Sequence, residues 1–299
     1  MINGDNKQAF LIVTNRISKD VVKRYHKLRK AAEELGDVFL LYHTNDNKIL
    51  TGFEEIKIEI FTDEILHNLD YKPIRKTLVP GSNHFPVLKF FLDHPHYTHY
   101  WSIEDDVAFN GNWKDFFENA SLKDFDFISS HIRKHSDMPR WSWWYTLKGP
   151  EGKFSAEKLY SSFNPLYKIS NKALQYINTC LRNGYSGHHE VLLPSLLFKA
   201  GFKIADFGAQ DNHITPWLSY CTLSTMRWKP IFFFKGIKKN KLYHPVKEKF
   251  TFKDILVFVK KTILNRKNYY NLKNGKNLHF LIKSCFFDIL NTDLKRLKM

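Results

Sequence analysis

Short apolar runs alternate with amphipathic stretches in the first part of the chain. Residues 9–14 and 38–42 are apolar and rich in aromatic and branched side chains, as expected for buried strands. Between them, apolar side chains recur at helical spacing, with Ser18 as a candidate N-cap and Gly36 as the end of the helix. This strand–helix–strand order predicts the opening of a parallel sheet in an α/β protein. No GxGxxG pattern joins strand to helix, which disfavours a dinucleotide fold of the NAD type.

A third apolar run, residues 97–103, reads as another buried strand. It is followed by three consecutive acids, Glu104, Asp105 and Asp106. After a short turn, apolar positions at i, i+3, i+4 and i+7 predict a helix that starts at Trp113, with Asn112 as its N-cap. The acids are therefore expected where a central strand ends, at the edge where open α/β sheets bind ligands.

Three adjacent carboxylates repel one another unless a cation lies among them. Their hard oxygen atoms suit Mg²⁺ or Mn²⁺, which keep open positions for phosphate oxygens. The alternative is a solvated acidic turn that caps the following helix. The position of the acids at the end of a buried strand favours the metal site.

Apolar periodicity predicts that strands and helices continue to alternate up to about residue 210. Further strands are expected at 55–61, 124–128, 163–170 and 202–207, and further helices at 87–92, after Ser170 as N-cap, and at 191–200.

The composition fits a large, folded, basic protein. The chain has 299 residues, of which 43% are hydrophobic and 16% aromatic, so wholesale disorder is not expected. The net charge of +16 predicts an anionic partner, such as nucleic acid, a lipid surface or a phosphorylated substrate. The three cysteines are far apart and show no CxxC spacing, which argues against a disulfide framework or zinc site and fits a reducing compartment. The polar N-terminus lacks a signal core, and no apolar run approaches the roughly 18–20 residues of a membrane span, so a cytoplasmic location is expected.

Half of the excess positive charge lies in residues 251–299, which contain eleven Lys and Arg residues but only three Asp residues. Apolar residues lie among these cations, as in basic amphipathic helices that bind anionic membranes. The alternative is a helical appendage that packs on the preceding domain and exposes a basic face. The chain is accordingly divided into a domain over residues 1–247 and a basic helical extension over residues 248–299.

Residues 131–145 mix cations with aromatic side chains, including Trp143 and Trp144, and follow no regular period. Aromatic faces stack on sugar rings and on bases, and cations suit an anionic substrate. Trp143 and Trp144 are therefore candidates for the wall of a binding site. The alternative is a loop that is buried by its own tryptophans.

The acidic trio at the end of an apolar strand resembles the DxD element of nucleotide-sugar glycosyltransferases with the GT-A fold. The resemblance implies a Rossmann-like α/β fold with a mixed, mainly parallel sheet flanked by helices, over about residues 9–247. It implies that Asp106 binds the metal, that Asp105 contacts the ribose or the metal, and that Glu104 supports them. The acidic element is the specific match, and residues 131–145 match no motif of the family.

The same resemblance places further residues on the donor side. Thr14, Asn15 and Arg16, at the end of the first strand, would lie near the nucleotide, although an ordinary polar loop is the alternative. Ser82 and Asn83, upstream of the acidic strand, would also contact the donor, where a plain turn is the alternative.

A late histidine and a lysine complete the donor site in many members of the family. His244 matches the extra metal ligand and Lys247 the residue that meets the diphosphate, with His213 as a second candidate ligand. An imidazole completes a mostly oxygen-bound Mn²⁺ site well, and a lysine is a point charge for phosphate. The alternative for His244 is a structural histidine.

On the acceptor side, a helix, a glycine loop and an apolar helix resemble the acceptor half of the family. Glu190 matches the general base of inverting members, which takes the proton of the attacking hydroxyl. The alternative is that Glu190 only complements the dipole in the first turn of a helix. His188 and His189 are candidates for contact with the acceptor. They are not expected to bind one metal together, because adjacent side chains point apart on regular structure.

The function that follows from the resemblance is a metal-dependent glycosyltransferase, of the inverting hexosyltransferase type. It would move sugar from a nucleoside-diphosphate sugar to a hydroxyl of a glycan or lipid-linked acceptor, in cell-surface polysaccharide or lipo-oligosaccharide synthesis. It would lie at the inner face of the cytoplasmic membrane. One alternative is a metal-dependent nuclease or phosphatase, disfavoured because no second carboxylate cluster provides a two-metal site. The other is a non-catalytic peripheral membrane protein.

Overall fold

The computed structural model describes residues 7–46, 52–208, 216–229, 231–232, 235–236 and 238–247. The predicted C-terminal extension, residues 248–299, and His213 lie outside the described residues. The chain forms two compact units. One contains Met1–Asp105 and Asn112–Thr222, and the other contains Asp106–Gly111 and Leu223–Met299.

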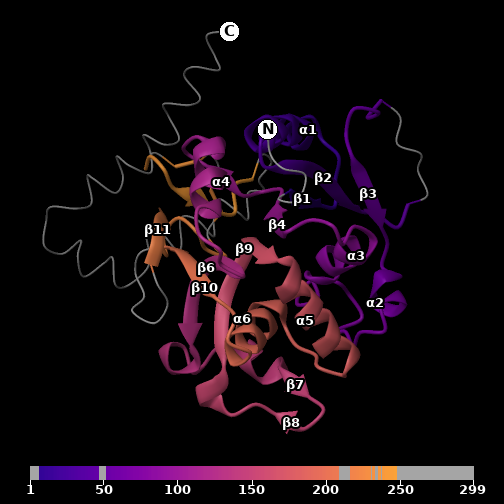
Figure 1. Cartoon of the computed structure of the whole chain (residues 1–299), viewed down its shortest axis with the longest axis vertical. Helices are drawn as coiled ribbons and strands as arrows, with labels where there is room; N and C mark the ends of the chain where they lie inside the picture. Colours follow the sequence, from indigo (N-terminus) through magenta and orange to yellow (C-terminus); the bar gives the residue numbers. More distant parts are fainter. Residues whose placement is uncertain are drawn as a thin grey trace, which may run out of the picture. The chain divides into compact units, whose positions relative to one another are not determined.

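An eight-stranded sheet runs through the first unit in the order β11-β10-β6-β9-β4-β1-β2-β3 (Figure 1). Its strands are β1 (Gln8–Thr14), β2 (Gly36–His43), β3 (Ile58–Phe61), β4 (His99–Glu104), β6 (Phe127–Lys134), β9 (Tyr160–Ser170), β10 (Ile204–Gly208) and β11 (Pro216–Cys221). β9 is antiparallel to its neighbours β4 and β6, and all other neighbouring pairs are parallel. The prediction of a mixed, mainly parallel sheet is confirmed.

Helices cover this sheet on both faces. They are α1 (Lys19–Ala32), α2 (Ile65–Asn68), α3 (Phe85–Asp93), α4 (Trp113–Ser121), α5 (Asn171–Arg182) and α6 (His189–Lys199). Side chains of β1 alternate between the faces, as in any strand. Ala9 and Leu11 join the core beneath α3, α5 and α6, whereas the Phe10 ring lies 4.6 Å from that of Phe117 in α4. Figure 1 shows α5 and α6 next to each other, close to β9.

Short elements complete both units. In the first, they are the 3₁₀ turns η2 (His135–Asp137), η3 (Ser142–Thr146) and η4 (Ala156–Lys158) and the hairpin of β7 (Lys148–Gly149) with β8 (Gly152–Lys153). In the second, β5 (Ala108–Phe109) pairs antiparallel with β12 (Leu242–Tyr243). None of the helices in the described part of the chain combines the length and the apolar character that a membrane span requires.

Some element boundaries differ from those expected. The strand expected at 124–128 begins at Phe127 and continues to Lys134. Asp126, just before it, is buried, and its carboxylate accepts hydrogen bonds from Ser170 Oγ at 2.9 Å and the Lys203 backbone N–H at 3.0 Å. The first helix ends at Ala32, and Gly36 is the first residue of β2 rather than the end of the helix.

The three predicted N-caps are confirmed. The side chains of Ser18, Asn112 and Ser170 accept hydrogen bonds of 3.2, 3.0 and 3.2 Å from backbone N–H groups in the first turns of α1, α4 and α5. Each cap pairs one of the N–H groups that the start of a helix leaves without a backbone partner. The cap at Asn112 fixes the start of α4, the helix whose apolar face (Trp113, Phe116, Phe117 and Ala120) is buried.

Replacing Asn112 by Ala removes this cap, so the free energy of unfolding is expected to fall by about 1 kcal/mol. Asn112→Ser keeps a capping oxygen and is expected to stay within a few tenths of a kcal/mol of the wild type. Urea unfolding monitored by circular dichroism measures both variants. Equal losses in the Ala and Ser variants would contradict a capping role.

Candidate functional site

Three of the residues expected near the nucleotide meet at the end of β4 in the first unit. Asp105 Oδ2 accepts a hydrogen bond from Thr14 Oγ1 at 2.7 Å and one from Arg16 Nε at 3.1 Å. The Asp105 N–H donates to the Val13 carbonyl at 3.1 Å, so the backbone also holds the carboxylate beside the end of β1. Asn15, between the two donors, is exposed.

In the second unit, the predicted residues Asp106, His244 and Lys247 come together although they are far apart in sequence. Asp106 is only 5% exposed. Its Oδ1 lies 3.2 Å from His244 Nε2, and its Oδ2 pairs with Lys247 Nζ. The pairing of β5 with β12 and a 2.8 Å hydrogen bond from the Val246 N–H to the Asp106 carbonyl hold the two segments together.

The orientation of the His244 ring indicates which nitrogen carries the proton. Nδ1 lies 2.9 Å from the carbonyl oxygen of Arg227, which can only accept, so Nδ1 donates. In a neutral imidazole, Nε2 then presents its lone pair to the Asp106 carboxylate. Two lone pairs at this distance repel unless a proton or a metal ion lies with them. A carbonyl behind a histidine is also the usual partner that orients a metal ligand, so the pair fits a cation site.

The environment keeps the Asp106 carboxyl ionised. Burial alone would raise its pKa, but the protonated form of His244 and the ammonium of Lys247 outweigh burial and hold the pKa below its usual range. The ligand atoms of Asp106 and His244 lie within 4.8 Å of each other. A buried carboxylate oxygen and an oriented imidazole nitrogen are a donor set that Mn²⁺ accepts. Glu104 is the last residue of β4 and belongs to the first unit.

Glu190 lies in the first turn of α6, as expected. Its carboxylate accepts a 3.4 Å hydrogen bond from the Asn164 N–H, and Oε2 lies 3.9 Å from His188 Nδ1. His188 is the N-cap of the helix and accepts a 3.3 Å hydrogen bond from the Glu190 N–H through Nδ1. The side chain of Glu190 is 16% exposed, so it is accessible as well as fixed.

Next to Glu190 lies a buried cluster of three histidines, which we call the histidine cluster: His84, His188 and His189. The His84 and His189 rings are parallel with centroids 6.3 Å apart, and those of His188 and His189 are 4.9 Å apart. Within the described residues, neither ring nitrogen of His84 has a hydrogen-bond partner, and the same is true of His189 Nδ1 and Ser82 Oγ. Buried polar atoms without partners are rare and indicate a place for water or a ligand.

The histidine cluster is uncharged at neutral pH. Burial, with the charge of His188, lowers the pKa of His84 to about 3, and burial, with the charge of Arg75, lowers the pKa of His188 to about 4. Burial also places the pKa of His189 well below its usual value. Sequence reasoning missed His84, which sits in the turn that carries Ser82 and Asn83. A histidine beside two candidate contact residues was the available signal.

The two tryptophans proposed for the acceptor wall differ in position. The Trp143 ring is partly exposed and lies 4.4 Å from the His188 ring, and the Arg75 guanidinium lies over it at 5.3 Å. Trp144 is 1% exposed, and its Nε1 donates to the Met138 carbonyl at 2.8 Å. Part of the Trp143 side chain is therefore accessible to a ligand, whereas Trp144 is part of the core.

The histidine cluster predicts acid sensitivity. The unfolded chain takes up protons on these residues near pH 6.5, whereas the folded chain does so only at much lower pH, so stability is lost as the pH falls from 7 toward 4. His84→Asn should reduce the slope of unfolding free energy against pH near pH 5 by about 1.4 kcal/mol per pH unit, one proton's worth. Urea unfolding at several pH values measures this slope. An unchanged slope would show that His84 is not a neutral buried histidine.

Comparisons with known proteins give partial matches. A family model described as "Protein of unknown function (DUF3405)" matches residues 37–148, less than half of the chain. No curated protein matches the sequence.

Solved structures with a similar arrangement have low sequence identity. One is 4-diphosphocytidyl-2C-methyl-D-erythritol synthase from Anaerococcus prevotii, with 10% identity, a TM-score of 0.42, and coverage of 68% of this chain and 89% of that one. Another is glucosyl-3-phosphoglycerate synthase from Mycobacterium tuberculosis in complex with Mn²⁺, uridine diphosphate and phosphoglyceric acid, with 12% identity, a TM-score of 0.40, and coverage of 67% and 68%. A third is a glycosyltransferase involved in glycosylation of the major capsid of PBCV-1, with 12% identity, a TM-score of 0.30, and coverage of 59% and 67%. The chain is thus similar in arrangement to these three proteins, and at this identity the similarity carries no statement about its activity.

Proposed function

We propose that the protein is a metal-dependent glycosyltransferase that moves a sugar from a nucleoside-diphosphate sugar to a hydroxyl of a glycan or lipid-linked acceptor. The observation that carries this proposal is the cluster of Asp106, His244 and Lys247. A buried carboxylate, an oriented imidazole and an ammonium group meet there from distant parts of the sequence. These are the groups that a metal–diphosphate complex requires.

Asp106 and His244 would hold Mn²⁺ or Mg²⁺, and Glu104 stays a candidate supporting ligand from its match to the acidic element of the family. The bound ion supplies positive charge for the diphosphate that leaves during transfer. Lys247, whose side chain is 37% exposed, can turn from Asp106 toward a phosphate oxygen and add a second positive charge. Lys247 and the metal ion would compete for the Asp106 carboxylate. The negative charge of Asp106 is therefore balanced both with and without the metal.

The nucleotide is assigned to the end of β4 in the first unit. Thr14 and Arg16 both bind Asp105 Oδ2, which leaves Oδ1 to accept a hydrogen bond from a ribose hydroxyl. Asn15 is exposed beside them and can reach the base. Because Asp105 and Asp106 are consecutive, the chain itself links the nucleotide contact to the metal ligand. Ser82 and Asn83 stay as candidate donor contacts.

Glu190 is assigned as the general base. It accepts the proton of the acceptor hydroxyl while the hydroxyl oxygen bonds to the anomeric carbon and the bond from that carbon to the diphosphate breaks. The developing positive charge on the sugar ring resembles that of other glycosyl transfers. Attack from the side opposite the diphosphate inverts the anomeric centre. Trp143, His188 and His189 are the proposed acceptor contacts, since His188 lies 3.9 Å from Glu190 and the rings of Trp143 and His189 lie against that of His188.

The setting of the reaction is proposed from charge. The basic residues 248–299 would bring the enzyme to an anionic membrane, where lipid-linked acceptors are found, on the cytoplasmic side. A role in cell-surface polysaccharide or lipo-oligosaccharide synthesis would follow.

A panel of UDP-, GDP- and CMP-sugars tests the donor site. At a donor concentration about 100 times its dissociation constant, one sugar nucleotide should stabilise the protein by about 2.7 kcal/mol when Mn²⁺ is present and much less without it. Asp106→Asn should lose the metal-dependent part, whereas Asp93→Asn, on an exposed turn of α3, should keep it. Thermal unfolding measures all three proteins. If no sugar nucleotide acts, or if the two variants respond alike, the proposed function is wrong.

Glu190→Gln tests the general base. The amide keeps the size of the side chain and can still accept a hydrogen bond from Asn164, but it cannot take a proton. Once the donor is known, kcat should fall about 10²- to 10⁴-fold while the affinity for donor stays unchanged. Glu157→Gln, in the exposed turn η4, is the matched control. If Glu190→Gln retains turnover, Glu190 is not the general base and serves only to complement the dipole of α6.

A further inference from the structure

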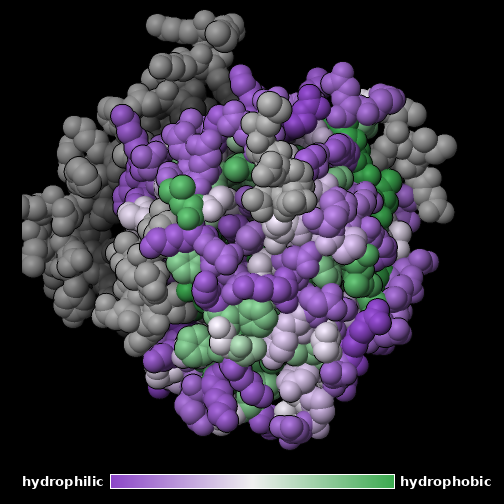
Figure 2. Space-filling view, in the orientation of Figure 1, coloured by the Kyte–Doolittle hydropathy of each residue, from purple (hydrophilic) through white to green (hydrophobic). Residues whose placement is uncertain are grey.

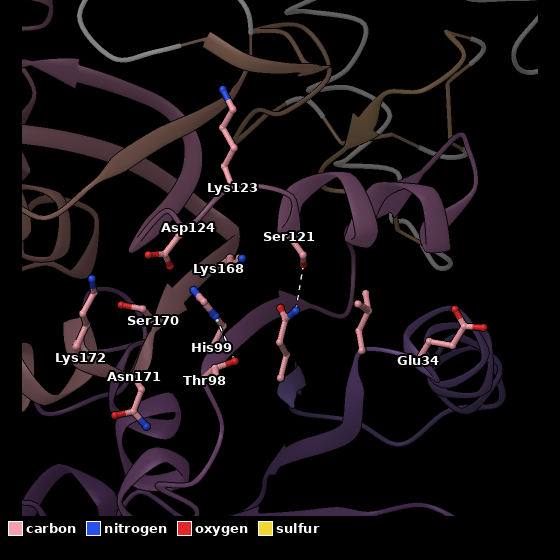
Figure 3. Close-up of a pocket in the computed structure, with 12 residues that line it drawn as sticks. Glu34, Thr98, His99, Ser121, Lys123, Asp124, Lys168, Ser170, Asn171 and Lys172 are labelled. Atoms are coloured by element: carbon pink, nitrogen blue, oxygen red, sulfur yellow. Dashed lines mark hydrogen bonds between the residues drawn. The ribbon is translucent and has the colours of Figure 1, made fainter. Parts of the chain in front are cut away.

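A cavity of about 660 Å³ opens in the first unit at the starts of β1 and β4 (Figure 3). The register of the two parallel strands pairs Gln8 with His99 at this end and Val13 with Glu104 at the other. Five residues of extended strand, roughly 16 Å, therefore separate the cavity from the end of β4 that carries Asp105. None of the residues assigned above to donor, metal or acceptor lines it.

The feature that distinguishes this cavity is Lys168, which projects from β9 into its wall. The residue is 1% exposed, and Nζ donates one hydrogen bond, to the Ala120 carbonyl at 3.2 Å. No carboxylate oxygen of the described residues lies within 4.0 Å of this ammonium. A buried charge normally has a counter-ion and uses its hydrogen-bond donors, because burial of an unpaired ion is costly. Lys168 has two N–H donors to spare beside an open cavity.

The other charges around the cavity do not supply that counter-ion. Glu34 is bonded to Lys114 at 2.8 Å, outside the cavity. Asp124 is 68% exposed and pairs with Lys203 at 4.0 Å. Figure 3 shows Lys123, Asp124 and Lys172 at the edges of the cavity. Lys172 pairs with the buried Asp126 at 3.0 Å, so its charge is already balanced. An anionic group that entered would meet the ammonium of Lys168 at the wall.

Lys168 keeps its charge at neutral pH. Burial lowers its pKa to about 8, and the more distant charge of Asp124 opposes that fall. The side chain is thus mainly an ammonium at pH 7, and a negative oxygen beside it would stabilise that form.

We propose that this cavity binds a small oxyanion, the phosphate or carboxylate group of a small molecule, against Lys168 Nζ. Such a group has several oxygen acceptors for the spare N–H donors and the negative charge that the buried ammonium lacks. The cavity has the volume of a small-molecule site, so it holds more than the anionic group itself. The site is separate from the proposed donor site, and both can be occupied at once.

Thermal unfolding of the full-length protein without divalent ions tests the proposal. Sodium phosphate, pyrophosphate and citrate are compared with sodium chloride at equal ionic strength. The melting temperature should rise with at least one oxyanion beyond the effect of chloride, and the phosphate and citrate arms identify the preferred group. Lys168→Met should raise the dissociation constant of that oxyanion by a factor of about ten or more, because the positive charge beside it is lost. Without ligand, Lys168→Met should be as stable as the wild type or more so, since a buried unpaired charge is removed.

Two charge reversals give a test that does not depend on a core substitution. Lys123→Glu and Lys153→Glu change the net charge equally at exposed residues, but only Lys123 lines the cavity. Lys123→Glu should raise the dissociation constant of the oxyanion about three- to tenfold, and Lys153→Glu should leave it unchanged. Asp106→Asn should also keep the response, which separates this site from the donor site.

The proposal is overturned if no oxyanion exceeds chloride in the wild type, or if a folded Lys168→Met responds as the wild type does. It is equally overturned if Lys123→Glu and Lys153→Glu respond alike, and this comparison decides the matter should Lys168→Met not fold.

Discussion

The site depends on how a buried carboxylate is kept charged. Asp106 is removed from water, which disfavours its ionised form, and two cationic or polar partners from the end of the described chain reverse that preference. His244 faces one carboxylate oxygen with a nitrogen that the Arg227 carbonyl has oriented, and Lys247 meets the other. The pairing of β5 with β12 holds together the two chain segments that carry Asp106 and His244. A metal ion and a diphosphate would use the same three groups.

Local patterns in the sequence predicted most of the first unit. The apolar runs, the helical stripes and the three N-caps rest on contacts within a few residues, so the sequence shows them directly. The ends of β6 did not follow from its apolar run, because its polar second half is held by strand pairing with β9, where Arg133 pairs with Ser161 and Lys134 with Tyr160. The antiparallel direction of β9 was also not readable, since direction depends on the path of the chain between strands.

The same division applies to functional residues. The adjacency of Asp106, His244 and Lys247 was expected from the family resemblance, and the structure brings them together. Lys168 and His84 could not be found in that way. A lysine or histidine is ordinary in sequence. Only the tertiary structure reveals that, within the described part of the chain, the buried Lys168 has no counter-ion and the buried His84 ring has no hydrogen-bond partner. Figure 2 shows hydrophilic and hydrophobic residues interspersed over one face of the molecule, with hydrophobic residues near β3 and others lower on the face, so the surface view does not single out the buried lysine and histidine.

The central claim is that His244 and Asp106 bind one metal ion. Pulsed electron paramagnetic resonance of the protein with one equivalent of Mn²⁺ tests it most directly, because a ligating imidazole couples its ¹⁴N nucleus to the manganese spin. A ¹⁴N coupling is expected in the wild type and should disappear in His244→Gln. Bound Mn²⁺ without any nitrogen coupling, or a coupling that survives the substitution, would contradict it.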